Sequence, residues 1–117
     1  MLAPLRESLA TGRPLHWNRV NDLGDFVYFN HAIHVNKGVG CETCHGRVDQ
    51  MPAIEQVAPM TMGWCLECHR DPAPFLRPLD QITTMGWQPQ GDPVVLAKEL
   101  MKRLDVHSRT SCTTCHR

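Results

Sequence analysis

Cys41-Glu42-Thr43-Cys44-His45 decides the fold, because its pattern of two cysteines three positions apart and a following histidine occurs three times. The pattern returns as Cys65-Leu66-Glu67-Cys68-His69 and again as Cys112-Thr113-Thr114-Cys115-His116. Together the three copies use all 6 cysteines of the 117-residue chain. A pattern that accounts for every cysteine indicates one chemical task carried out three times.

This spacing is typical of covalent haem attachment. Two thiols three positions apart reach the two vinyl groups of one porphyrin as thioethers, and the adjacent imidazole is then placed to bind the iron. We therefore predict three covalently bound haems c, one at each motif. The predicted thioether residues are Cys41, Cys44, Cys65, Cys68, Cys112 and Cys115, and the predicted proximal iron ligands are His45, His69 and His116.

Two other uses of paired cysteines explain less of the pattern. A four-cysteine zinc site would employ two of the pairs, but it leaves the third pair and the histidine after each pair without a role. A thioredoxin-like disulfide is expected beside a βαβ pattern, which this sequence lacks.

The remaining histidines are candidate distal ligands on the far side of each iron. His31 lies 14 residues before His45, close enough for the intervening loop to hold one haem between them. His34 follows after three residues, on the same side of a helical turn, where it would face a neighbouring haem. We predict both as distal ligands.

The third distal ligand is left open by the residues alone. A methionine thioether would raise the haem potential relative to a second histidine, and His107 and His16 are the remaining imidazoles. We favour Met62, which lies just before the second motif, with His107 and then His16 as alternatives. The methionines considered for this role are Met60, Met62 and Met85.

Composition limits the classes of function. The chain carries 12 basic and 12 acidic residues, so its zero formal charge gives no electrostatic case for nucleic acid or for an anionic membrane surface. Apolar residues make up 42% of the sequence, but 9 prolines keep the apolar runs short. A small chain of this kind usually depends on covalent cross-links, metals or cofactors to stay folded. No apolar run approaches 18 residues, so we expect no membrane-spanning helix.

The chain is expected to form one domain, residues 1–117, with a leading segment over 1–25 and a haem-binding core over 26–117. The predicted fold class is mainly irregular and α-helical, with few helices packed around three haems. Asp92 and Pro93 predict the start of the only long helix, over 93–105. A weak helix over 2–10 is expected before it, together with a strand-like run at 26–29 and an extended, proline-rich loop over 71–78.

The order of these motifs resembles the opening of class III multihaem cytochromes. Phe29-Asn30-His31-Ala32-Ile33-His34 followed by residues 41–45 matches that family's F-x-H-x-x-H element and first haem motif. By position, the resemblance implies that His31 shares a haem with His45 and His34 shares one with His69. Triheme members take the last distal histidine from just before the second motif. Here residues 59–64 contain no histidine, which strengthens the case for Met62.

A second resemblance covers most of the chain from Arg13 onward. Four blocks of sequence resemble the multihaem cytochrome subunit of alternative complex III, which is a bacterial membrane quinol-oxidising complex. That subunit typically has five haem motifs and a membrane helix, so we expect this chain to correspond to its C-terminal portion or to a split subunit. The blocks are Asp25-Phe26-Val27-Tyr28-Phe29-Asn30-His31, Cys44-His45-Gly46-Arg47-Val48, Met62-Gly63-Trp64-Cys65-Leu66-Glu67-Cys68-His69-Arg70 and Ser111-Cys112-Thr113-Thr114-Cys115-His116-Arg117.

The resemblance implies a position on the periplasmic face of a membrane respiratory complex. Its partners would be an iron–sulfur and molybdopterin-like subunit, other cytochromes, and a redox partner cytochrome or oxidase that accepts the electrons. We expect an electron carrier and not an enzyme, with a free-standing soluble triheme shuttle as the alternative. The haem propionates would find cationic partners among Arg47, Arg70, Arg77 and Arg117.

Overall fold

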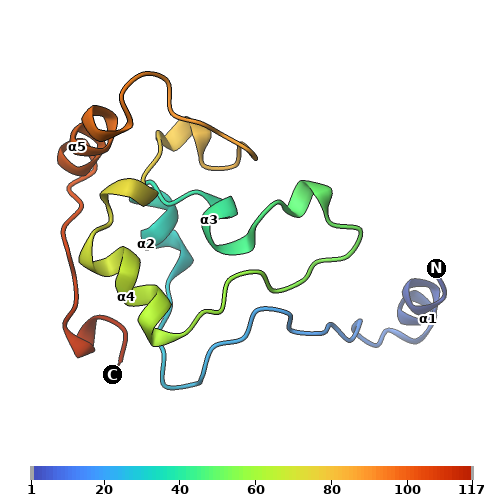
Figure 1. Ribbon diagram of the computed structural model, residues 1–117. Coiled ribbons are helices and arrows are strands. Elements are labelled where there is room, and N and C mark those ends of the chain that lie inside the picture. The colour runs from blue at the N-terminus through green and yellow to red at the C-terminus, as the bar shows by residue number, and fades with distance from the viewer. Residues whose placement is uncertain (1, 117) are drawn as a thin grey trace.

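The computed structural model describes residues 2–116, and within them all regular structure is helical (Figure 1). Short α-helices and single 3₁₀ turns alternate with irregular chain, and the described residues contain one isolated antiparallel bridge, between Val39 and Leu76, in place of a sheet. The elements are α1 (Ala3–Thr11), α2 (His31–Asn36), α3 (Cys41–His45), η1 (Val48–Gln50), α4 (Met62–Arg70), η2 (Ala73–Phe75), η3 (Leu79–Gln81), α5 (Pro93–Arg103) and η4 (Cys112–Thr114). The expected fold class, mainly irregular and α-helical, is confirmed.

The longest helix begins where the sequence predicts. The side chain of Asp92 accepts a hydrogen bond from the Val94 N–H at 2.8 Å, and Pro93 occupies the first turn. α5 ends at Arg103, two residues earlier than expected, and α1 is displaced by one residue from the predicted range. Differences of this size are usual at helix ends.

The protein core is small and lies where α5 meets the chain around η2. Its buried apolar side chains are Ala58, Leu76, Ile82 and Leu100, of which Leu100 on α5 has no exposed surface. Lys37, just after α2, donates to the carbonyl oxygens of Leu104 and Asp105 at 2.8 and 3.1 Å and so joins the ends of α2 and α5. So little buried apolar surface is what a chain that packs around cofactors would show.

Arg77 is the buried cation of this core. Its guanidinium donates to the Thr84 carbonyl at 3.0 Å, lies 5.4 Å from the ring centre of Trp87, and approaches the Glu42 carboxylate to 4.0 Å. Glu42 also accepts from the Gly86 N–H at 2.7 Å. Because Glu42 lies inside the first cysteine motif, these contacts fix α3 against the loop that follows η3.

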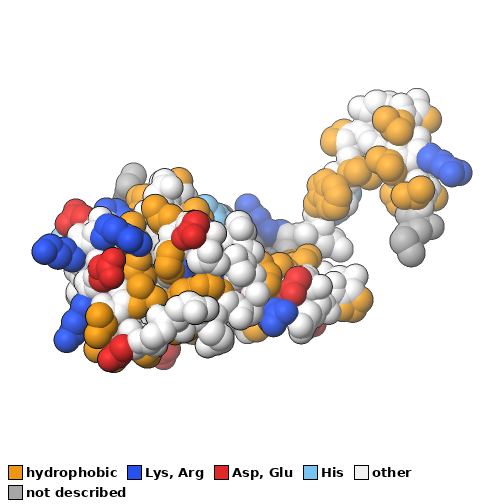
Figure 2. All heavy atoms as spheres, turned by 90° about the horizontal axis from the view of Figure 1, so that it is seen from above, with side chains coloured by type: hydrophobic (Ala, Val, Ile, Leu, Met, Phe, Trp, Pro, Cys, Tyr) orange, Lys and Arg blue, Asp and Glu red, His pale blue; other side chains and the backbone are white. Residues whose placement is uncertain are grey.

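The molecule is extended. Its radius of gyration is 17.5 Å, against about 13 Å for a compact chain of this length. Figure 1 shows α1 apart from α2 to α5, and Figure 2, seen from above, shows it as a separate lobe joined by a thin connection. Apolar side chains on this leading segment are exposed, among them Leu5, Leu9 and Trp17. Across residues 2–116, no helix has the length and apolar character needed to span a membrane.

Two local expectations were wrong. Residues 26–29 form no strand, because their backbone groups bind the third cysteine motif instead: the Tyr28 N–H donates to the Cys115 carbonyl at 2.9 Å. The loop over 71–78 is not fully extended, since η2 lies within it and Leu76 pairs with Val39. In both segments, contacts distant in sequence override the local preference.

Candidate haem-binding site

The three motifs lie on separate elements that meet in space. The first forms α3, the second lies in α4, and the third begins with η4. Burial raises the pKa of the Cys44 thiol, and the proximity of Cys65 raises it further. Burial also raises the pKa of Cys65, and the proximity of Cys115 raises it further. The Arg109 N–H donates to the His69 carbonyl oxygen at 3.0 Å, so the chain just before the third motif lies against the second motif.

The thiols do not resemble a zinc site. Burial raises the pKa of Cys68 to about 11, with Cys44 and Cys65 contributing. Within residues 2–116, no three side chains of His, Cys, Asp or Glu converge as metal ligands would. The six cysteines are all unpaired thiols.

Two histidine pairs face each other across gaps of equal width. The rings of His31 and His45 are nearly parallel, at 6°, with centres 6.1 Å apart. Those of His34 and His69 have centres 6.0 Å apart and planes at 63°. Two imidazoles on opposite sides of one metal, each bonded at about 2 Å, have ring centres about 6 Å apart. The structure thus brings together the pairs that the class III resemblance implied, at a separation that fits an iron between them.

Each motif histidine is held at Nδ1 by a different segment of chain. His69 Nδ1 lies 2.9 Å from the Arg109 carbonyl oxygen, and His116 Nδ1 lies 3.1 Å from that of Phe26. A carbonyl only accepts, so these nitrogens carry the proton and leave Nε2 as the lone-pair donor for a metal. His45 Nδ1 instead lies 3.3 Å from the side-chain amide of Asn21.

The distal candidate His34 is oriented in the same way. Its Nδ1 lies 2.8 Å from the Asn30 carbonyl oxygen, so its Nε2 is also left as the metal donor. The Asn30 side chain accepts from the Ala32 N–H at 2.9 Å and caps α2, the helix that carries both His31 and His34. Burial lowers the pKa of His34 and favours the neutral imidazole, which is the form that binds iron.

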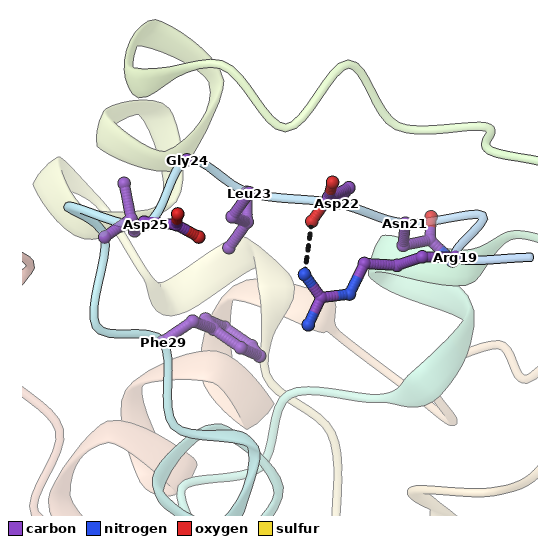
Figure 3. A pocket seen from close by; sticks show the side chains of 8 residues that line it. Arg19, Asn21, Asp22, Leu23, Gly24, Asp25 and Phe29 are labelled. Carbon is purple, nitrogen blue, oxygen red and sulfur yellow. Dashed lines mark hydrogen bonds and ion pairs between the residues drawn. The ribbon is translucent and has the colours of Figure 1, made fainter.

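A hollow of about 310 Å³ lies beside the first histidine pair (Figure 3). Asn21, which contacts His45, and Phe29, whose ring centre is 4.8 Å from that of His31, both line it. Figure 3 shows the Arg19 guanidinium and the Phe29 ring pointing toward one another across this space. The lining residues are Arg19, Asn21, Asp22, Leu23, Gly24, Asp25, Val27 and Phe29.

The third motif has no facing imidazole among the described residues. The ring that faces His116 is that of Phe26, with centres 5.8 Å apart and planes at 25°. Met62 is the first residue of α4 and is 68% exposed. His107 binds Asp105 through Nε2 at 2.7 Å, and His16 is exposed in the leading segment. The structure therefore brings none of the three candidates into contact with His116.

The candidate propionate arginines differ in their surroundings. Arg77 is buried, and its guanidinium donates to the Thr84 carbonyl oxygen inside the protein. Arg47 forms a two-point contact with Asp49, at 2.8 and 2.7 Å. Arg70 is exposed at the end of α4, whereas Arg117 lies outside the described residues.

Cysteine motifs of this kind on a small helical framework without strands define the class of multihaem c-type cytochromes. A comparison with protein families agrees: the family of cytochrome c7 and related cytochromes c matches residues 27–117, and the chain belongs to that family. Comparison with curated proteins finds no match. Membership establishes covalent haem c with its iron as the cofactor and multihaem electron transfer as the activity.

The residues present fit this cofactor. The cysteines are unpaired thiols, and two imidazoles face each other at the separation that one iron requires. Apolar side chains near them are exposed in the protein alone, for example Ile33 at 59%. A bound haem accepts and releases single electrons at its iron. The chain's own contribution is to anchor it at two thiols, to orient the imidazoles through Nδ1, and to set the surrounding charge.

Two positioning residues have no signal in the sequence. Asn21 and Arg109 bind the Nδ1 atoms of His45 and His69 from 24 and 40 residues away. Arg109 acts through its backbone, so any residue type would serve there. Asn21 acts through its side chain, but nothing near it in the sequence indicates a partner at His45.

Proposed function

We propose that this chain carries three haems c, one at each motif, and relays electrons through them as a subunit of a periplasmic, membrane-bound quinol-oxidising complex resembling alternative complex III. The observation that carries the electron relay is the two pairs of facing imidazoles, His31 with His45 and His34 with His69, at 6.1 and 6.0 Å. Two histidines per iron give a low-spin site with both axial positions filled, which suits electron transfer and leaves no position for a substrate.

The closeness of the motifs supports a relay. His31 and His34 lie on one six-residue helix, and the Phe29 ring is in contact with both, at 4.8 and 4.5 Å between ring centres. Haems held by these two histidines are therefore neighbours. Ser108 and Arg109, which lead into the third motif, donate to the His69 carbonyl oxygen at 2.9 and 3.0 Å, which supports a third haem next to the second.

For the haem at His116 we propose Met62 as the distal ligand, with His107 as the alternative. The Nε2 atom of His107 is engaged in a hydrogen bond with Asp105 at 2.7 Å, which favours Met62. Met62→Leu should abolish a methionine–iron band in the near-infrared spectrum of the oxidised protein, and Met85→Leu is the matched control. If the band is absent from the wild type, or survives in Met62→Leu, Met62 is not the ligand.

The leading segment supports the role of a subunit. α1 has no buried residue, and Leu9 and Trp17 are 78% and 79% exposed. Apolar side chains exposed on a protruding segment are typical of a surface that a partner covers. Covalent haem attachment takes place outside the cytoplasm, which is the basis for the periplasmic location.

The haem count and ligands are tested with the purified holoprotein. We expect an intact mass equal to the polypeptide plus three haems. His31→Ala and His34→Ala should each convert one haem from low-spin to a state that binds carbon monoxide when reduced, whereas His16→Ala should not. Fewer than three haems, or fully low-spin spectra in both variants, would contradict the ligand assignment.

Complex membership is tested separately in the native host. We expect the chain to fractionate with membranes and to be released, together with partner subunits, by mild detergent. Recovery as a soluble monomer without detergent would favour a free-standing shuttle and reject the subunit role.

A further inference from the structure

The Nδ1 contact of His45 differs in kind from those of the other motif histidines. His69 and His116 face backbone carbonyls, which no substitution of a side chain can remove. His45 faces the half-buried side-chain amide of Asn21, with the Nδ2 atom 3.3 Å from Nδ1. One of the three proximal imidazoles is therefore under the control of a single side chain.

The amide of Asn21 presents a donor to His45, whereas a His45 bound to iron needs an acceptor. Its Oδ1 atom is buried without a hydrogen-bond partner within residues 2–116, whereas Nδ2 occupies the position next to His45. A His45 that binds iron through Nε2 carries its proton on Nδ1, and that proton requires an acceptor. Rotation of the amide by 180° presents Oδ1 to Nδ1–H and so supplies this acceptor, while Nδ2 takes the buried position that Oδ1 held.

We propose that Asn21 is a positioning residue for the haem held by His45 and His31, and that its amide oxygen sets the potential of that haem alone. An acceptor at Nδ1 raises the basicity of the imidazole and so stabilises the oxidised iron. This proposal rests on the proposed function, because it requires His45 to be an iron ligand. Asn21 lies before the range that matches the family, residues 27–117, so family membership does not supply this role.

An ion pair between Arg19 and Asp22, at 2.9 Å, flanks Asn21 and is visible in Figure 3. Asn21 also lines the hollow beside the first histidine pair. The leading segment, which otherwise extends away from the body, is thereby tied to the first haem site.

The test compares two variants that change the acceptor in opposite senses. Asn21→Leu removes it and should raise the potential of one haem, and Asn21→Asp substitutes an anionic acceptor and should lower it. We expect about a tenfold change in the equilibrium between oxidised and reduced iron, which equals about 59 mV for a one-electron couple. Potentials are measured by spectroelectrochemical titration of the holoprotein, and the affected haem is identified as the one altered in His31→Ala.

Controls separate this proposal from the function on which it rests. Asn18→Leu, an exposed asparagine in the same segment, should leave every potential unchanged. Shifts in the same direction for both Asn21 variants would indicate loosened packing and overturn the proposal, as would potentials that do not move. A wild type with fewer than three haems, or a His31→Ala variant with no spectral change, would instead reject the ligand assignment.

Discussion

Arg77→Met isolates the interactions of the buried arginine with the loop that follows η3. The guanidinium donates one hydrogen bond to the Thr84 carbonyl at 3.0 Å and lies 5.4 Å from the Trp87 ring centre. Methionine keeps much of the apolar stem but removes the charge and the donor. The neighbouring Glu42 carboxylate, at 4.0 Å, is at the outer limit of an ion pair, so we assign it no separate contribution.

The magnitude follows from these two contacts. A hydrogen bond from a charged group contributes about 2 kcal/mol, and a largely buried cation–π contact contributes about 1 kcal/mol. We therefore expect Arg77→Met to reduce the free energy of unfolding by about 3 kcal/mol. For a protein of this size the free energy of unfolding falls by about 3 kcal/mol per molar of guanidinium chloride. The unfolding midpoint should therefore fall by about 1 M.

The assay is equilibrium unfolding of the holoprotein in guanidinium chloride, followed by circular dichroism and by Soret absorbance. Arg103→Met is the matched control, because Arg103 is 54% exposed and its pair with Glu99 spans one helical turn; its effect should stay within about 0.5 kcal/mol. Equal midpoints for Arg77→Met and wild type would show that the Arg77 contacts do not stabilise the fold, and would refute the reasoning.

Three further substitutions test other parts of the structure. Asn30→Ala removes the cap of α2 and should cost about 1 kcal/mol in the same titration; an unchanged midpoint would show that the cap is not formed. Leu100→Ala should cost about 2–5 kcal/mol, whereas Leu100→Met should cost under about 1.5 kcal/mol, and equal effects would contradict the tight packing around a side chain with no exposed surface. His107→Ala should leave the haem spectra unaltered and raise the pKa of Asp105, because the hydrogen bond from His107 holds that pKa below its ordinary value; a carboxyl titration by NMR measures it, and a changed haem spectrum would revive His107 as a ligand.

The parts of the site that lie in short motifs could be predicted from the sequence. Covalent haem attachment follows from spacing within five residues, and the placing of His31 and His34 follows from one helical turn. The start of α5 could be predicted for the same reason, because Asp92 caps this helix through a contact with a residue only two positions away.

Contacts between distant segments could not be predicted. Residues 26–29 have strand-forming side chains, but they bind the third motif, about 90 residues later, and remain irregular. Arg77 lies in the core, where its guanidinium contacts Thr84 and Trp87, and nothing near it in the sequence indicates these contacts. No local pattern in a single sequence indicates such contacts between distant residues.

Identical residues also take different structures here. Thr61-Met62-Gly63-Trp64 begins α4, with the Thr61 side chain accepting from the Trp64 N–H. Thr84-Met85-Gly86-Trp87 forms a turn in which Gly86 has a φ of 66°, a left-handed conformation that glycine adopts without strain. The second copy is held by Glu42 at the Gly86 N–H, a contact absent from any local pattern.

Counting the axial ligands of the oxidised holoprotein tests the central claim most directly. Electron paramagnetic resonance at low temperature distinguishes low-spin iron with two imidazoles from iron with any other ligand set. The facing pairs His31–His45 and His34–His69 predict two such irons per chain with distinct signals, since one pair is nearly parallel at 6° and the other is crossed at 63°. Signals from fewer than two bis-imidazole irons would contradict the account.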